Sequence, residues 1–193
     1  MSSRTVCEQY MRAALALAQK GAGRVSPNPM VGALVVRGKQ VIGSGYHRVF
    51  GGAHAEVHAL RRAGAQARGA DLYVTLEPCS HHGKTPPCVD AVIASGIKRV
   101  FIGQKDPNPR VSGRGIRRLR AAGIEVKTGI LRTESAVLNE AFSKHVTTGL
   151  PLVVLKAAMT LDGKIATRTG DSRQSPTFWP AACGTRTAPA TKA

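Results

Sequence analysis

Four side chains near the middle of the sequence have the types and spacing of a zinc site with a general base. His54 offers an imidazole, and Cys79 and Cys88 offer thiolates, a ligand set that leaves a fourth zinc position open. Two thiolates offset the charge of the ion, so a nearby base is useful, and Glu56 follows His54 by two residues. The residues therefore predict one zinc ion per chain and a hydrolytic reaction.

The order of these residues is typical of zinc-dependent deaminases of nucleobases, which have H-x-E followed by P-C and use the glutamate as a base, not as a ligand. His54 to Glu56 and Pro78 to Cys79 fit this order. Eight residues separate Cys79 from Cys88, where the compact pattern has two. H-A-E alone is typical of an ordinary helix, but together with E-P-C and P-P-C it favours deamination of a pyrimidine-like ring.

Strands and helices alternate around these residues. We expect strands at 31–36, 41–46, 71–76, 99–102, 125–127 and 152–156, and helices at 5–20, 54–63, 88–95, 112–122 and 132–144. Residues i and i+2 do not share a helix face, so His54 should lie where its helix begins. Cys88 should start a helix, where the thiolate is favoured. The alternation predicts an α/β domain with a mostly parallel sheet after an initial hairpin.

Length and composition suit one domain with a short extension, since the chain has 193 residues of which 42% are apolar. No apolar run reaches the ~18 residues of a membrane span, and the N-terminus reads as an amphipathic helix and not a signal peptide. We therefore expect a cytoplasmic protein. Cys7 and Cys183 are interpreted as ordinary cysteines.

The net charge of +17 favours partners that carry phosphate. Arginine is locally dense in only two segments, residues 61–68 and 113–120, and both segments are interpreted as solvated helix faces. Aromatic residues are few (4%) and do not interleave with these runs, so nucleic-acid binding is not expected. A small phosphorylated substrate is the expected partner.

Longer motifs carry a resemblance to a known family. They are SPNPMVGA at 26–33, GYH at 45–47, HAEVHAL at 54–60, TLEPCSHHGKTPPC at 75–88, DPNP at 106–109 and GRG at 113–115. On these residues the chain resembles the bifunctional deaminase–reductase family of riboflavin biosynthesis, in its N-terminal diaminohydroxyphosphoribosylaminopyrimidine deaminase domain. The long spacing from Cys79 to Cys88 separates this family from other zinc deaminases.

The resemblance implies a three-layer α/β/α sandwich with a mixed sheet, similar to cytidine deaminase. It implies hydrolytic removal of the 2-amino group from 2,5-diamino-6-(5-phosphoribosylamino)pyrimidin-4(3H)-one to give 5-amino-6-(5-phosphoribosylamino)uracil. Glu56 would move a proton from the attacking water to the ring nitrogen and the leaving ammonia. Positions that match the family's substrate pocket are Asn28, His47, His81, Lys84, Asp106 and Asn108.

Some of these matches have simpler interpretations. Asn28 and Asn108 each lie in P-N-P, where asparagine is a common turn former, and His47 could be an ordinary histidine at a strand end. Lys84 would suit the phosphate.

The family continues into an NADPH-dependent reductase domain. We expect a deaminase domain at 1–145, a fragment of the start of a reductase domain at 146–173, and a divergent, disordered tail at 174–193. Since so short a segment cannot form a nucleotide-binding fold, neither reductase activity nor NADPH binding is expected.

Two alternatives stay open. The charge favours a tRNA or nucleoside deaminase, whereas the long loop between Cys79 and Cys88 argues against one. The chain could also be an inactive truncated remnant, in which an uncovered strand at 152–156 favours a homo-oligomer or aggregation.

Overall fold

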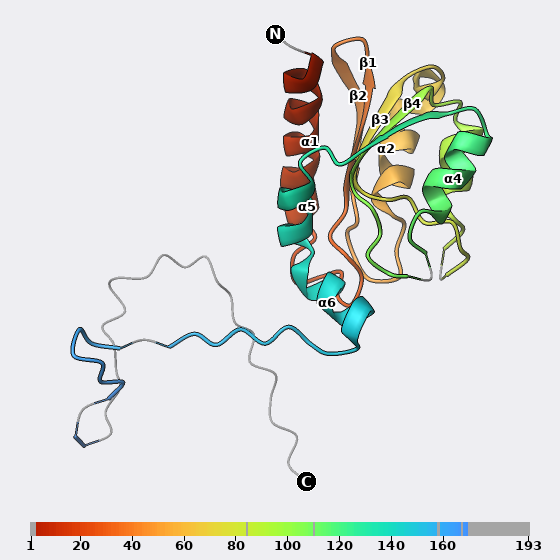
Figure 1. Cartoon of the computed structure of the whole chain (residues 1–193). Helices are drawn as coiled ribbons and strands as arrows, with labels where there is room; N and C mark the ends of the chain where they lie inside the picture. The colour runs from red at the N-terminus through yellow and green to blue at the C-terminus, as the bar shows by residue number, and fades with distance from the viewer. Residues whose placement is uncertain (1–2, 84, 110, 158, 167, 170–193) are drawn as a thin grey trace. The chain divides into compact units, whose positions relative to one another are not determined.

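Five strands form one mixed sheet in the order β2-β1-β3-β4-β5 (Figure 1). The strands are β1 (Gly32–Arg37), β2 (Gln40–Tyr46), β3 (Asp71–Leu76), β4 (Arg99–Gln104) and β5 (Glu125–Thr128). The helices are α1 (Ser3–Gln19), α2 (Ala55–Ala63), α3 (Cys88–Ala94), α4 (Arg114–Ala121), α5 (Arg132–Leu138) and α6 (Glu140–Thr148), with a 3-10 turn η1 (Gly64–Ala67). This computed structural model describes residues 3–83, 85–109, 111–157, 159–166 and 168–169.

The sheet is mixed, as the resemblance implies, and the strands after the initial hairpin pair in parallel as expected. β1 runs antiparallel to both β2 and β3, and only the pairs β3–β4 and β4–β5 are parallel. The chain crosses from β2 through α2 to β3, so that β3 runs in the same direction as β2. β1 lies between them and runs in the opposite direction to both. The carboxyl ends of β2, β3 and β4 therefore lie at the same edge of the sheet, where ligand sites of α/β folds form.

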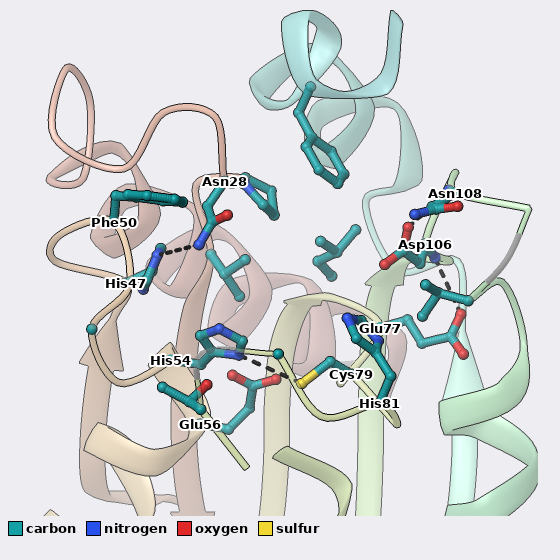
Figure 2. Close-up of a pocket in the computed structure, with 18 of the residues that line it drawn as sticks. Asn28, His47, Phe50, His54, Glu56, Glu77, Cys79, His81, Asp106 and Asn108 are labelled. Atoms are coloured by element: carbon teal, nitrogen blue, oxygen red, sulfur yellow. Dashed lines mark hydrogen bonds between the residues drawn. The ribbon is translucent and has the colours of Figure 1, made fainter. Parts of the chain in front are cut away.

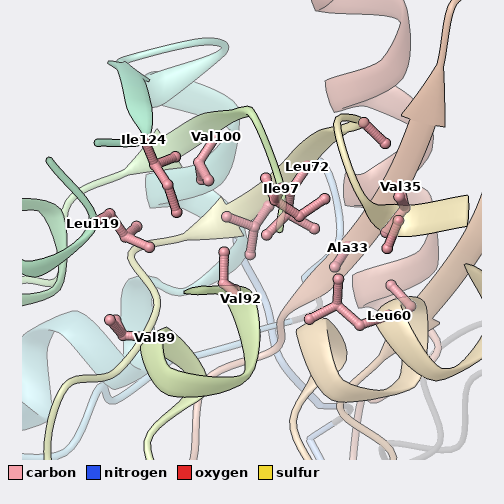
Figure 3. Close-up of a cluster of buried hydrophobic side chains, with 14 of the residues drawn as sticks. Ala33, Val35, Leu60, Leu72, Val89, Val92, Ile97, Val100, Leu119 and Ile124 are labelled. Atoms are coloured by element: carbon pink, nitrogen blue, oxygen red, sulfur yellow. The ribbon is translucent and has the colours of Figure 1, made fainter. Parts of the chain in front are cut away.

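Helices cover both faces of the sheet, which confirms the expected three-layer arrangement. On one face α1 packs against β1 and β3, and α5 packs against β4; α2, α3 and α4 cover the other face (Figure 1). The side chains of β1 alternate accordingly, because Leu34 and Val36 face α1 while Ala33 and Val35 join the larger core cluster under α2 and α3 (Figure 3). Burial on both faces explains why β1, β3 and β4 are mostly apolar, whereas the edge strands β2 and β5 are partly exposed and more polar.

Glycines let α2 lie directly on β2. A Cβ atom added at Gly43 would overlap the carbonyl oxygen of Ala59, and one added at Gly45 would overlap that of Ala55. The helix that begins just after His54 is therefore positioned by backbone contact with the strand.

We predict that Gly45→Ala destabilises the protein and lowers its activity together. The added methyl group meets backbone, which cannot rotate away, so the loss should be at least the ~1–3 kcal/mol that overpacking costs. A thermal melt should show a Tm lower by several degrees, on the order of 2–4 °C per kcal/mol. Ser44→Ala, a change at the neighbouring half-buried position, should melt close to the wild type; equal melting of both variants would contradict the close-packing argument.

Two expectations about elements were wrong. The helix expected at 132–144 is two helices, because Asn139 breaks it and uses its side chain to bond the backbone N–H and C=O of Met30 instead. The strand expected at 152–156 is absent from the described residues, which contain no paired partner for it and leave most of this segment exposed.

By its internal contacts the chain divides into two units, Met1–Leu152 and Val153–Ala193. In the second unit the described residues form turns, with Lys164 paired to Asp162 at 2.9 Å. The tail expected at 174–193 and Cys183 lie outside the described residues, and the expected boundaries at 145 and 173 stay predictions. No helix among the described residues is long and apolar enough to cross a membrane.

Candidate active site

His54, Cys79 and Cys88 meet at the edge of the sheet where β2 and β3 end. Their ligand atoms all lie within 4.8 Å of one another. The Nδ1 atom of His54 is 3.0 Å from the Sγ of Cys88 and 3.6 Å from the Sγ of Cys79. Ligands of one tetrahedral zinc ion lie about 3.5–4 Å apart, so the distance from His54 to Cys79 suits zinc, and His54 and Cys88 lie somewhat closer together. One imidazole and two thiols are a donor set that fits zinc.

Local structure brings the two distant cysteines together. Cys79 follows the end of β3, and the chain then folds back so that Cys88 becomes the first residue of α3. The backbone N–H of Cys88 donates to the Sγ of Cys79 at 3.3 Å, and the N–H of Val89 donates to the carbonyl oxygen of Cys79 at 3.2 Å. The long loop is thus closed by two hydrogen bonds at Cys79.

Hydrogen bonds within the cluster keep Cys79 ionised. A hydrogen bond from the Cys88 thiol lowers the pKa of Cys79 to about 4, while the same bond raises the pKa of Cys88. The contact with Cys79 in turn raises the pKa of His54. A thiolate is therefore present in the cluster at neutral pH, as a metal ligand must be.

Glu56 lies beside the ligand cluster and is 3% exposed. His54 has an extended backbone and immediately precedes α2, so both side chains reach the same space, although they are only two residues apart (Figure 2). Within the part of the chain that the structure describes, the Oε2 atom of Glu56 is buried without a hydrogen-bond partner, and burial raises the pKa of this carboxyl to about 7. An unpartnered buried carboxylate oxygen next to a metal site fits a base that holds a proton during turnover.

A cavity of about 240 Å³ opens over Glu56. Every expected site residue that the structure describes lines it, apart from Cys88, which is buried beneath: Asn28, His47, His54, Glu56, Cys79, His81, Asp106 and Asn108 (Figure 2). Lys84, the residue expected to meet a phosphate, lies outside the described residues.

His47 fixes the orientation of Asn28. Its Nδ1 lies 3.2 Å from the carbonyl oxygen of Ala53, so Nδ1 carries the proton and donates there. Its Nε2 is then left to accept from the side-chain amide of Asn28, at 3.2 Å. Burial lowers the pKa of His47, which agrees with this neutral form. The amide oxygen of Asn28 therefore points away from His47 and can accept a hydrogen bond in the cavity (Figure 2).

Several residues of the cavity were missed by sequence reasoning. They are Phe50, Glu77, Val111 and Phe142. Phe142 comes from α6, far along the chain, and nothing in the sequence indicates that this helix reaches the site. Glu77 could have been noticed, since a carboxylate between a buried strand and Pro78 needs partners to be buried.

Glu77 ties the zinc loop to the loop that carries Asp106 and Asn108. It is 3% exposed, and its Oε2 accepts from the backbone N–H of Asp106 at 3.1 Å and of Gly113 at 2.9 Å. Its Oε1 accepts from Ile116 at 3.2 Å. The Asp106 side chain in turn accepts from the N–H of Asn108 at 2.8 Å. One carboxylate thus places both the start of α4 and the far wall of the cavity.

We predict that Glu77→Gln raises KM for the substrate while the zinc content stays close to that of the wild type. The amide keeps one acceptor oxygen but turns an NH₂ group toward a backbone N–H, which leaves a buried donor unsatisfied at a cost of about 1–3 kcal/mol. The loop at Asp106 should loosen while the three metal ligands stay. Steady-state kinetics and zinc analysis check this, with the exposed Glu134→Gln as the control. Loss of zinc at an unchanged KM would show that Glu77 supports the metal instead.

Comparison with known proteins gives consistent matches. Residues 4–104 match the family described as the cytidine and deoxycytidylate deaminase zinc-binding region. The riboflavin biosynthesis protein RibD of Bacillus amyloliquefaciens is 60% identical over 166 residues, which cover 86% of this chain and 45% of that protein. A diaminohydroxyphosphoribosylamino-pyrimidine deaminase of Buchnera aphidicola (subspecies Schizaphis graminum) is 51% identical over 142 residues, 74% of this chain and 97% of that protein.

A solved structure of Acinetobacter baumannii RibD is similar with a TM-score of 0.86 and 46% identity, covering 89% of this chain and 48% of that one. The chain thus spans about half the length of the RibD proteins it matches, whereas it covers nearly all of the Buchnera deaminase.

Proposed function

The chain belongs to the cytidine and deoxycytidylate deaminase family and, within it, to the diaminohydroxyphosphoribosylaminopyrimidine deaminases, and we propose that it hydrolyses the 2-amino group of 2,5-diamino-6-(5-phosphoribosylamino)pyrimidin-4(3H)-one. The observation that carries this proposal is the buried carboxylate of Glu56, whose Oε2 has no partner among the described residues, beside a cluster of two thiols and one imidazole. In the overall reaction water replaces the amino group, so the ring gains a carbonyl and ammonia leaves.

In this proposal His54, Cys79 and Cys88 hold one zinc ion. When bound, zinc supplies Lewis acidity that makes water nucleophilic near neutral pH. Glu56 accepts a proton from the attacking water and gives it to the ring nitrogen. It then takes the remaining proton from the newly formed hydroxyl group and gives it to the amino group, which leaves as ammonia while the carbonyl forms. Its burial suits this role, because a carboxyl whose pKa lies near 7 can both take and give a proton.

The other polar residues of the cavity hold the ring. The Asn28 amide oxygen, fixed by His47, accepts from a ring N–H or amino group. Asp106 and Asn108 offer a carboxylate and an amide from the opposite wall, and their geometry is set by Glu77. Such groups recognise the donor-rich edge of a diaminopyrimidinone better than they recognise an apolar ligand.

Ammonia release tests the function directly. The purified chain should release ammonia from the phosphoribosylated diaminopyrimidinone, and much less from cytidine or deoxycytidylate. Treatment with a chelator should stop the reaction, and added zinc should restore it. Deamination of cytidine at the higher rate would overturn the substrate assignment, and activity that survives complete zinc removal would overturn the role of the metal.

A further inference from the structure

A second hollow, of about 340 Å³, adjoins the zinc cavity. Its walls are formed by the zinc loop and the start of α4, through Ser80, His81, Val111, Arg114, Arg117 and Arg118. His81 and Val111 also line the zinc cavity, so the two hollows share a wall and are neighbours. A ligand in the first hollow that is long enough to reach beyond these two residues would meet the second.

Positive charge gathers around this second hollow. Arg118 is paired with Asp90 at 2.6 Å and reaches the carbonyl oxygen of Ser80, so it builds the wall. Within the described residues, neither Arg114 nor Arg117 takes part in an ion pair. Two guanidinium groups therefore face the hollow without a counter-charge from the described part of the chain.

A further cation lies close by. The Nζ of Lys105 and the Nη1 of Arg117 lie 3.1 and 3.5 Å from the position that a Cβ atom at Gly113 would take. Like charges brought this close repel each other, and a bound anion would relieve the repulsion. The first turn of α4 does not serve as the anion site itself, because Glu77 already accepts from the N–H groups of Gly113 and Ile116.

The chemistry of the hollow suits a phosphate monoester. A guanidinium group forms two parallel hydrogen bonds to phosphate oxygens, and Ser80 adds a hydroxyl donor. We infer that Arg114 and Arg117, with Ser80, form the subsite for the phosphate of the substrate whose ring lies at the zinc cavity. This inference rests on the proposed function, and it gives a role to the arginine-rich segment that sequence reasoning interpreted only as a solvated helix face.

The test compares two substrates, the phosphoribosylated diaminopyrimidinone and its dephosphorylated ribosyl form. The wild type should prefer the phosphorylated form. In the double variant Arg114→Gln, Arg117→Gln, kcat/KM for that form should fall about 10- to 100-fold, as expected for losing charge-assisted hydrogen bonds, mainly through a higher KM. The preference for the phosphorylated form should then largely disappear. Inorganic phosphate should inhibit the wild type competitively and the variant only weakly.

Arg61→Gln is the matched control, since it removes one exposed positive charge on α2 that lines neither hollow. The single variants Arg114→Gln and Arg117→Gln are measured beside it. If the Arg61 control loses as much as either of them, general electrostatic attraction explains the effect and the subsite is wrong. Equal losses on both substrates would mean a structural role, and no loss on either would also overturn the inference; in these cases the deaminase function stands. A wild type that deaminates neither substrate would instead refute the proposed function.

Discussion

Glu56→Gln should reduce kcat by at least about 10²–10⁴-fold, the range that a positioned acid–base group contributes, while the zinc content stays at one ion per chain. Glutamine keeps the size of the side chain but cannot take a proton at neutral pH. The unpartnered Oε2 position of Glu56 is where that proton would be held. Ammonia release under saturating substrate measures kcat, and metal analysis measures zinc.

Glu140→Gln is the control for this experiment, because Glu140 is an exposed residue on α6 away from the cavity lining. Its rate should equal that of the wild type. Equal rates in the Glu56 and Glu140 variants would sink the proton-transfer role of Glu56. Loss of zinc in the Glu56 variant would show that this carboxylate holds the metal site together, which the mechanism does not require.

Cys88→Ser should remove zinc and activity together. Cys88 is 1% exposed and lies 3.0 Å from His54, and serine is a poor zinc ligand, so the variant keeps only two of the three ligands. Metal that binds only the folded state stabilises it by mass action, so a chelator should lower the Tm of the wild type. The Tm of the Cys88 variant should not respond to chelator or to added zinc.

Cys7→Ser serves as the matched cysteine control, since Cys7 lies on α1 near the Tyr73 hydroxyl and far from the metal ligands in the fold. It should keep its zinc and its response to chelator. Full zinc binding by the Cys88 variant would contradict the proposed ligand set.

Most of the helices and strands could be predicted because each is a local pattern. The strand at 71–76 and the helix from Ala55 to Ala63 follow from β-branched residues and from helical spacing after a glycine turn. The break at Asn139 could not be predicted, because its cause is a pair of hydrogen bonds to Met30, which is 109 residues away. The antiparallel pairing of β1 with β3 could not be predicted either, because it depends on how the crossover through α2 places β3 beside β1.

The candidate site divides in the same way. The ligand set and Glu56 could be predicted, because zinc chemistry restricts both residue types and order. Phe142 could not, since it carries no motif and reaches the site only through helix packing. The arginines of α4 are visible in the sequence as a basic run that includes the GRG motif, but their place beside the site is visible only in the fold. Glu77 is an intermediate case: its position is visible in the sequence, but its three backbone partners, at Asp106, Gly113 and Ile116, are visible only in the fold.

The glycine contacts between α2 and β2 divide the cavity into a stiff wall and a yielding one. At Gly43 and Gly45 the backbone of β2 lies directly against the backbone of α2. No side chain lies between them that could change rotamer and make room, so α2 resists sliding along the strand. His54 and Glu56 are therefore carried on the stiff wall. The opposite wall, at Asp106 and Asn108, is held by hydrogen bonds that start from Glu77 and not by packed backbone, so it is the less rigid of the two.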